Sequence, residues 1–90
     1  MAENKIDTGN IYIEEEENYV AIRVNTRLYR VHSIMNAADD FLEESNFIID
    51  GDPEKEIIVK FVPKRKLSRE QLADLAHRFC TLLVEFSSTR

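Results

Sequence analysis

The sequence predicts an α+β fold: a small, mostly antiparallel sheet of three to four strands with two helices packed on one face, in the order (β)βαββα. Three observations support this class. Apolar residues alternate with polar ones near the start of the chain, they recur at helical spacing in two longer segments, and two β-branched runs flank a short connection containing Gly and Pro. Ninety residues suit one modest core, so we expect a single domain over residues 11–90 after a flexible tail at residues 1–10.

The first half of the domain is predicted to contain one or two strands and a helix. The alternating apolar residues of the strands are Ile11 and Ile13, then Val20, Ile22 and Val24. The acidic run Glu14–Glu17 between them suits a hairpin turn, but adjacent like charges disfavour close pairing, so order in a first strand at residues 11–15 stays open here. From Arg30 a helical stripe begins that predicts a helix ending near Ser45 and Asn46; it comprises Val31, Ile34, Met35, Ala38, Phe41 and Leu42.

The second half is predicted to be a hairpin followed by a helix. The runs NFIID and EIIVKFV are joined by GDPEK, which suits a tight antiparallel connection. Ser68 and Gln71 form a capping box flanked by Leu67 and Leu72, so a helix begins there. Its apolar face is Leu72, Leu75, Ala76, Phe79, Leu82, Leu83 and Phe86, and we expect it to end near Phe86. A crossover through the first helix would set residues 19–25 parallel to one hairpin strand and make the sheet mixed.

The sheet face away from the helices is predicted to be unusually apolar. The core face takes Val20, Ile22, Val24, Phe47, Ile49, Ile57, Val59 and Phe61. Alternation then leaves Tyr19, Ala21, Ile48, Ile58 and Val62 on the opposite face. A cluster of this kind marks a contact with a protein or peptide partner or with a second copy, and a sheet edge adds a site for strand addition. The alternative is that the N-terminal segment, with Tyr12, folds over this face.

The charges are separated along the chain, which bears on nucleic-acid binding. Residues 1–59 hold 14 acidic against 5 basic groups, and residues 60–90 hold 3 against 7. Any phosphate contacts would come from the local patch Lys60, Lys64, Arg65, Lys66 and Arg69. The only aromatic residue there, Phe61, is assigned to the core, so no base-stacking surface accompanies the patch. A solvated loop and helix start is the favoured interpretation, and nucleic-acid binding is kept as an alternative.

Catalytic and metal-binding signals are weak. No carboxylate lies one helical turn from His32 to orient its ring for catalysis. No glycine-rich turn surrounds Ser33 that would expose it as a nucleophile. Asp74, His77 and Cys80 follow at intervals of three residues, which offers at most three ligands where structural zinc takes four. A metal- or thiol-dependent enzyme component built on them is kept as a second alternative. Gly9 and Gly51 are the only glycines, so no phosphate-cradling loop is available. We expect no enzyme activity, no cofactor and no bound metal.

One resemblance to a known family rests on the segment LYRVHSIMNAADDFLEESNFIIDGDPEKEIIVKFVPK. Its matching features are the pair Leu28 and Tyr29, the helix residues Ile34, Ala37, Ala38 and Phe41, the hairpin from Phe47 to Val62, then Pro63, Lys64, Phe79, Leu82 and Leu83. With these features, the chain resembles the small D-type protein of His-Xaa-Ser peptide-maturation systems over about residues 20 to 86. The chain departs from that pattern at EFSSTR, where the family continues into a longer basic tail.

The resemblance implies an accessory protein that acts beside radical SAM enzymes on a ribosomally made peptide, and it brings no catalytic residues. Together with the apolar second face, it leads us to expect a non-enzymatic interaction module whose partner is a peptide, a radical SAM enzyme or a second copy in a homodimer. The first residues, MAENKIDTGN, contain no apolar segment, and no later run reaches membrane-spanning length. We therefore expect a cytoplasmic protein without a membrane contact.

Overall fold

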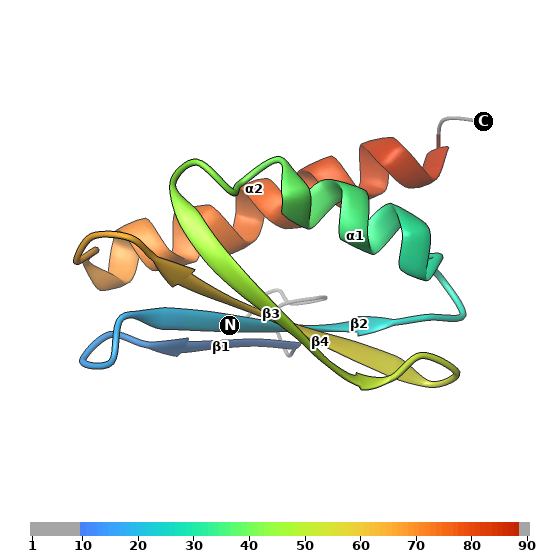
Figure 1. Ribbon diagram of the computed structural model, residues 1–90, viewed down its shortest axis with the longest axis horizontal. Helices are drawn as coiled ribbons and strands as arrows, with labels where there is room; N and C mark the ends of the chain where they lie inside the picture. The colour runs from blue at the N-terminus through green and yellow to red at the C-terminus, as the bar shows by residue number, and fades with distance from the viewer. Residues whose placement is uncertain (1–9, 89–90) are drawn as a thin grey trace.

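The predicted α+β class is confirmed. The computed structural model describes residues 10–88, so the tail predicted at residues 1–10 lies, apart from Asn10, outside the described residues. The elements are β1 (Ile11–Glu14), β2 (Tyr19–Asn25), α1 (Val31–Asp39), β3 (Ser45–Asp52), β4 (Glu56–Pro63) and α2 (Arg69–Ser88) (Figure 1). The first strand is therefore formed, and its pairing with β2 places Glu15, Glu16 and Glu17 of the acidic run in the turn of a hairpin, which we call the acidic turn.

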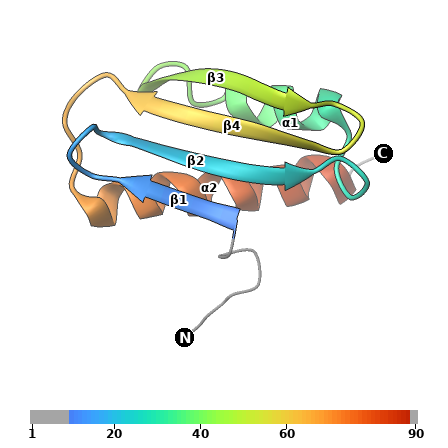
Figure 2. The same cartoon turned by 90° about the horizontal axis from the view of Figure 1, so that it is seen from below.

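The sheet is antiparallel throughout, as predicted for most of it, and the mixed sheet considered as a consequence of the crossover is not formed. Its strand order is β1-β2-β4-β3 (Figure 2). β2 and β3 are each antiparallel to β4 and so run in the same direction, as the crossover through α1 requires. They are not neighbours, because the hairpin returns β4 into the space between them. β2 and β4 are the two inner strands, and the helix-facing residues of β4, which are Ile57, Val59 and Phe61, are therefore buried.

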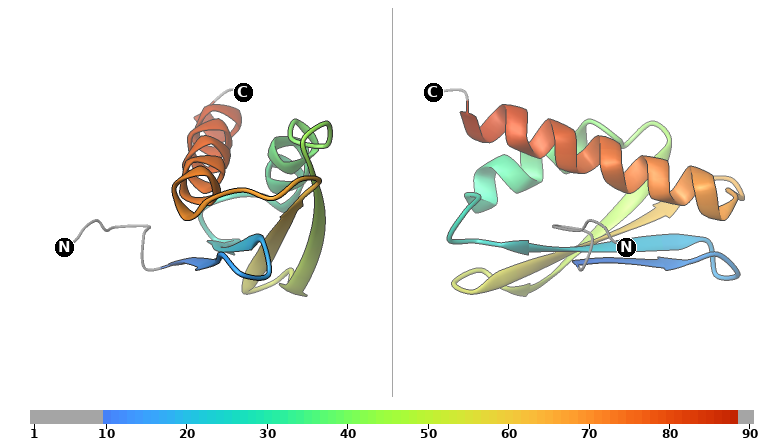
Figure 3. Two further views of the ribbon diagram at one scale, coloured as in Figure 1. Left: turned by 90° about the vertical axis from the view of Figure 1, so that its left-hand side faces the viewer. Right: turned by 180° about the vertical axis from the view of Figure 1, so that it is seen from behind.

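Both helices lie on one face of the sheet and make a two-layer molecule (Figure 3). α2 lies over β1 and β2, and α1 lies over β3 and β4 (Figures 2 and 3). Four phenylalanine rings join the layers. Phe61 on β4 meets Phe41 at 5.6 Å between ring centroids, Phe79 at 5.2 Å and Phe47 at 6.2 Å. Phe47 and Ile49, predicted in the core, are only half-buried, because β3 is the last strand of the sheet.

α1 is shorter than predicted and faces the core differently. It ends at Asp39, and turns carry the chain on to β3. The helix cannot continue to Ser45, because Ser45 is already paired with Pro63 in the sheet and the chain needs residues 40–44 to reach it. Met35 and Leu42, predicted on the buried stripe, are 43% and 42% exposed, whereas Ala37, outside that stripe, is fully buried.

The start of α2 agrees with the capping-box prediction. The backbone N–H of Gln71 donates to Ser68 Oγ at 3.2 Å, and the backbone N–H of Ser68 donates to Gln71 Oε1 at 2.9 Å. This exchange satisfies two backbone donors that an uncapped helix would leave unpaired. α2 runs beyond Phe86 to Ser88 and rises away from the sheet toward its end (Figure 1). Phe86 is therefore 36% exposed and not part of the core, contrary to prediction.

The β3–β4 turn depends on the absence of a side chain at Gly51. The φ angle there is +103°, and a Cβ atom would lie 2.5 Å from the Glu56 carbonyl oxygen. We expect Gly51→Ala to lower the free energy of unfolding by about 1–3 kcal/mol through backbone strain and this clash. Urea unfolding followed by circular dichroism measures the loss. Glu54→Ala in the same turn is the control and should change stability by less than about 0.5 kcal/mol; equal midpoints for the two variants would contradict the assignment.

Candidate functional site: the uncovered sheet face

The face of the sheet opposite the helices is uncovered in the described part of the chain (Figure 2). Strand alternation directs both apolar and charged side chains to it, the charged ones including Glu14, Arg23, Asp50 and Glu56. We call the apolar members together with Lys60 the outer patch: Tyr12, Tyr19, Ala21, Ile48, Ile58, Lys60 and Val62. A single row crosses all four strands, because Ala21 pairs with both Tyr12 and Lys60, and Lys60 pairs with Ile48. All five predicted partner-binding residues therefore share this face.

Two members of the outer patch were not predicted there. Tyr12 was considered only as part of a segment folding over the face, but residues 11–14 form β1 and extend the sheet sideways. The alternation of Ile11 and Ile13 toward the core could have placed Tyr12 on this face. Lys60 was considered only as part of the basic segment, although its position between the core residues Val59 and Phe61 in the strand already implies the outer face.

Aromatic and cationic contacts organise one end of the outer patch. The rings of Tyr12 and Tyr19 lie 6.1 Å apart between centroids, and Lys60 Nζ lies 4.1 Å from the centroid of the Tyr19 ring. The Tyr12 hydroxyl donates to Glu14 Oε1 at 3.0 Å, and this hydrogen bond raises the pKa of Tyr12 above its usual value. The patch thus combines flat apolar surface with a positive charge held over a ring.

Exposure within the outer patch is greatest at its two sides. Tyr12 on β1 is 56% exposed and Ile48 on β3 is 54% exposed, while the patch residues on β2 and β4 are half-buried by their neighbours. The nearby carboxylate of Glu56 forms an ion pair with Arg23, with 3.6 Å between Arg23 Nε and Glu56 Oε2. The result is an apolar surface across the sheet with charged groups toward the β3–β4 turn.

The basic segment after β4 is tied to the acidic turn between β1 and β2. Asn18 donates from Nδ2 to the Arg65 carbonyl oxygen at 2.9 Å and accepts at Oδ1 from the Leu67 amide at 2.9 Å. Lys66 Nζ donates to the carbonyl oxygens of Glu15 and Glu16. We call this set of contacts the turn clasp. Lys64, Arg65 and Arg69 are exposed, but the fold brings the most acidic segment of the chain beside them, which weakens a positive field.

The residues of the predicted metal-binding alternative are not assembled into a site. Asp74 Oδ2 accepts from Arg78 Nε at 3.0 Å, and the same guanidinium donates to both carboxylate oxygens of Glu44 at 3.0 and 3.1 Å. His77 is exposed and Cys80 is half-buried. Within residues 10–88, no three His, Cys, Asp or Glu side chains are grouped so that they could hold a metal ion.

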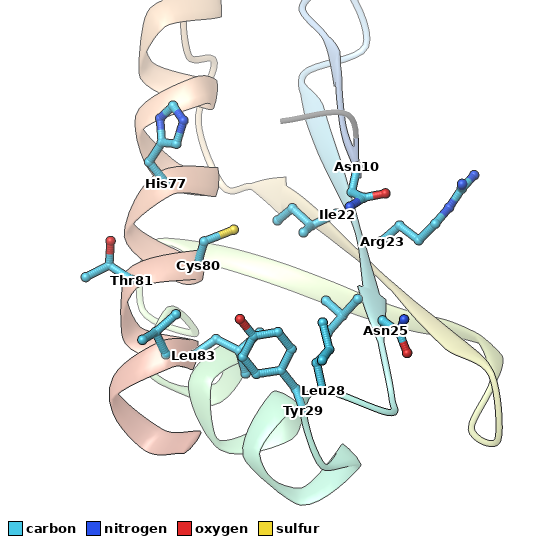
Figure 4. Close-up of a pocket in the computed structure, with 12 residues that line it drawn as sticks. Asn10, Ile22, Arg23, Asn25, Leu28, Tyr29, His77, Cys80, Thr81 and Leu83 are labelled. Carbon is cyan, nitrogen blue, oxygen red and sulfur yellow. The ribbon is translucent and has the colours of Figure 1, made fainter. Parts of the chain in front are cut away.

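A cleft of about 620 Å³ between α2 and the end of β2 was not predicted. Leu28 and Tyr29 reach into it from the loop before α1, and Cys80 reaches into it from α2 (Figure 4). It exists because β1 pairs with β2 only as far as Ile22, so the edge of β2 from Arg23 to Asn25 is open in the described part of the chain. No local sequence signal reports the unequal lengths of two paired strands.

Comparisons with known proteins give no match: no family model, curated protein or solved structure is significantly similar to the chain. Of the helices in residues 10–88, none combines the length and the apolar character that a membrane span needs.

The Glu44–Arg78 pair makes a pH-dependent contribution to stability. The hydrogen bonds from Arg78 lower the pKa of Glu44 below 4.5, its ordinary value. A carboxyl group with a lowered pKa in the folded state stabilises the fold above its unfolded pKa and loses this effect as the pH falls through the folded value. We expect Glu44→Gln to cost about 0.5–1 kcal/mol at neutral pH, because both side chains are about half exposed.

This difference from the wild type should shrink as the pH falls below 4.5. Urea unfolding at a series of pH values measures it. Glu43→Gln is the matched control, because Glu43 is an exposed neighbour of the same charge. A Glu44→Gln deficit that stays constant through the acid range would contradict the ion-pair assignment.

Proposed function

We propose that this protein is a non-enzymatic interaction module that binds a protein or peptide partner through the outer patch. The observation that carries the proposal is the aromatic and aliphatic surface that runs across all four strands and that no other part of residues 10–88 covers, with Tyr12 and Ile48 each more than half exposed. Apolar clusters of this kind are expensive to leave in water and are typical of binding surfaces. Tyrosine is also among the residues that contribute most to protein interfaces.

The charge within the outer patch supports a partner of particular chemistry. Lys60 lies over the Tyr19 ring, and its neighbours across the strands are Ala21 and Ile48, neither of which can neutralise it. A partner surface with apolar side chains around a carboxylate would bury the tyrosines and pair with the ammonium group together. A two-fold face-to-face contact centred on Lys60 would instead bring two ammonium groups together, so a different molecule suits this face better than a second copy.

The resemblance to the D-type proteins of His-Xaa-Ser systems gives this partner a candidate identity. It implies a radical SAM enzyme or its peptide substrate, with this chain presenting the peptide or assembling the enzyme complex. Leu28 and Tyr29, which carry part of the resemblance, line the cleft beside β2 and offer a second surface to such a complex.

Substitutions in the outer patch should abolish partner binding without unfolding the protein. We expect Tyr12→Lys combined with Ile58→Lys to weaken binding at least about tenfold, because an aromatic contact is lost and charge enters an apolar interface. Affinity capture from cells that produce the tagged protein, followed by mass spectrometry, compares the variants. Asn36→Lys, on the exposed side of α1, is the matched control and should retain the partner.

A radical SAM protein or its precursor peptide that is captured by the wild type and by Asn36→Lys, and lost with the double variant, would support the proposal. Equal capture by all three proteins would argue against the outer patch. Loss of the circular dichroism signal in the double variant would instead assign Ile58 to the core, and Tyr12→Lys alone would then be the informative variant because Tyr12 is 56% exposed.

Nucleic-acid binding through Lys64, Arg65, Lys66 and Arg69 has less support, because the acidic turn lies against this segment. We expect the wild type to pass through a heparin column at low salt, because the acidic turn weakens the positive field of the segment. Changing Glu15, Glu16 and Glu17 together to Gln removes three negative charges beside the segment. This variant should therefore be retained on heparin, and added salt should release it. The control changes Asp50, Asp52 and Glu54 to Asn, Asn and Gln, at the opposite end of the sheet. Strong, salt-sensitive retention of the wild type would favour the nucleic-acid class instead.

A further inference from the structure

The outer edge of β3 is open. Of the two edge strands of the sheet, β3 has eight residues and β1 has four. Within residues 10–88, β3 pairs only with β4, so the backbone groups on its other side meet no strand. Such an edge is a template for another strand, and native proteins usually protect it with charge, proline or a short length.

The side chains of β3 do not protect this edge. Phe47, Ile48 and Ile49 form an apolar run at its centre, and the first charged residue of the strand is Asp50. Phe47 and Ile49 are half-buried, whereas their partners on β4, Phe61 and Val59, are fully buried. Both faces of the edge strand therefore keep apolar surface that another strand would cover.

We propose that β3 pairs with β3 of a second copy of this chain, antiparallel and about a two-fold axis through Ile48. The sequence around Ile48 is self-complementary in this register. Ile48 faces Ile48 of the partner subunit, and Phe47 faces Ile49 of the partner subunit, so apolar residues meet on both faces of the sheet. Asn46 faces Asp50 of the partner subunit, and its side-chain amide can donate to that carboxylate.

The neighbouring registers are worse. Paired residues must lie on the same face, so the axis must pass through a residue, and the nearest alternatives to Ile48 are Phe47 and Ile49. An axis at Phe47 sets Asn46 against Ile48 of the partner subunit, and an axis at Ile49 sets Ile48 against Asp50 of the partner subunit. Each places a polar group against an apolar one. Only the axis at Ile48 matches like with like.

One like-charge contact in the proposed register is already compensated. Glu44 would face Asp52 of the partner subunit at the end of the paired segment. Its carboxylate accepts two hydrogen bonds from Arg78, at 3.0 and 3.1 Å, so its negative charge is partly neutralised within its own chain. Asp50 and Asp52 do not meet their own copies, because they lie away from the axis.

The association makes a sheet of eight strands with one continuous outer surface. A two-fold axis between antiparallel edge strands stands perpendicular to the sheet, so both outer patches lie on the same side. Ile48, at the side of each patch, then lies at the centre of the combined surface. This inference stands apart from the proposed function, because it uses the edge of β3 and not the face of the sheet.

The solution mass of the wild type and of five variants tests this pairing. Light scattering behind size-exclusion chromatography should give the wild type about twice the 10.5 kDa of one chain at high concentration. Ile48→Lys sets two ammonium groups opposite each other at the axis and should give a monomer. Asn46→Asp sets carboxylates opposite each other at two symmetric positions and should raise the dimer dissociation constant about tenfold.

The register is tested by a charge exchange. Asn46→Asp combined with Asp50→Asn restores an amide opposite a carboxylate and should restore the dimer. Asn46→Asp combined with Asp39→Asn has the same net charge but changes a residue on α1, and it should stay as weak as Asn46→Asp alone. All these positions are exposed, so the fold is expected to persist.

A wild type that stays near 10.5 kDa at every concentration would overturn the proposal. The proposal would also fail if Asp39→Asn restored the dimer of the Asn46→Asp variant as well as Asp50→Asn does. Tyr12→Lys separates the two proposals, because Tyr12 lies on β1, at the other side of the sheet. That variant should lose the partner and keep the dimer. If it lost the dimer as well, the association would use the sheet face and the β3 pairing would be wrong.

Discussion

The contact of Phe61 with three other phenylalanine rings is the interaction on which the rest of the structure depends. Phe61 lies fully buried on the central strand, Phe79 comes from α2, Phe41 from the turns after α1, and Phe47 from the edge strand. Edge-on packing at these distances is favourable for aromatic rings beyond the area that they bury. This cluster determines which side chains of β4 face the helices. Because paired residues share a face, the side chains of the other three strands that face away from the helices are then determined as well, and they include the outer patch.

This arrangement leaves apolar surface exposed on the sheet face and in the cleft beside β2. The groups that carry chemistry are used elsewhere or kept apart: Arg78 engages Asp74, and Lys66 engages the carbonyls of the acidic turn. In a chain of 90 residues the two layers bury many of the apolar side chains, and others stay exposed on the sheet face, on the helices, on the β3 edge and in the cleft beside β2. The exposed sheet face is the basis of the proposed recognition of another chain.

Local signals predicted the parts of the fold that local interactions determine. The Ser68–Gln71 capping box and the alternation in β2 and β4 involve residues close in sequence, and both are found as predicted. The end of α1 is set instead by the pairing of Ser45 with Pro63, a contact between distant residues, so the helical stripe alone overestimated its length. The position of β4 between β2 and β3, the cleft and the place of Lys60 beside Tyr19 likewise depend on which strands meet. The five predicted outer-face residues were found by alternation alone, because their strands were correctly located.

The turn clasp has a consequence for how folding can be observed. Asn18 Oδ1 accepts from the Leu67 backbone amide, 49 residues away along the chain, so this bond closes a loop that contains β2, α1, β3 and β4. Closing so long a loop costs chain entropy that the intervening contacts must offset. The Leu67 amide hydrogen therefore stays bonded to Asn18 only while both ends of that loop are in place. Its exchange with solvent deuterium therefore reports whether the β1–β2 turn and the segment before α2 are still joined.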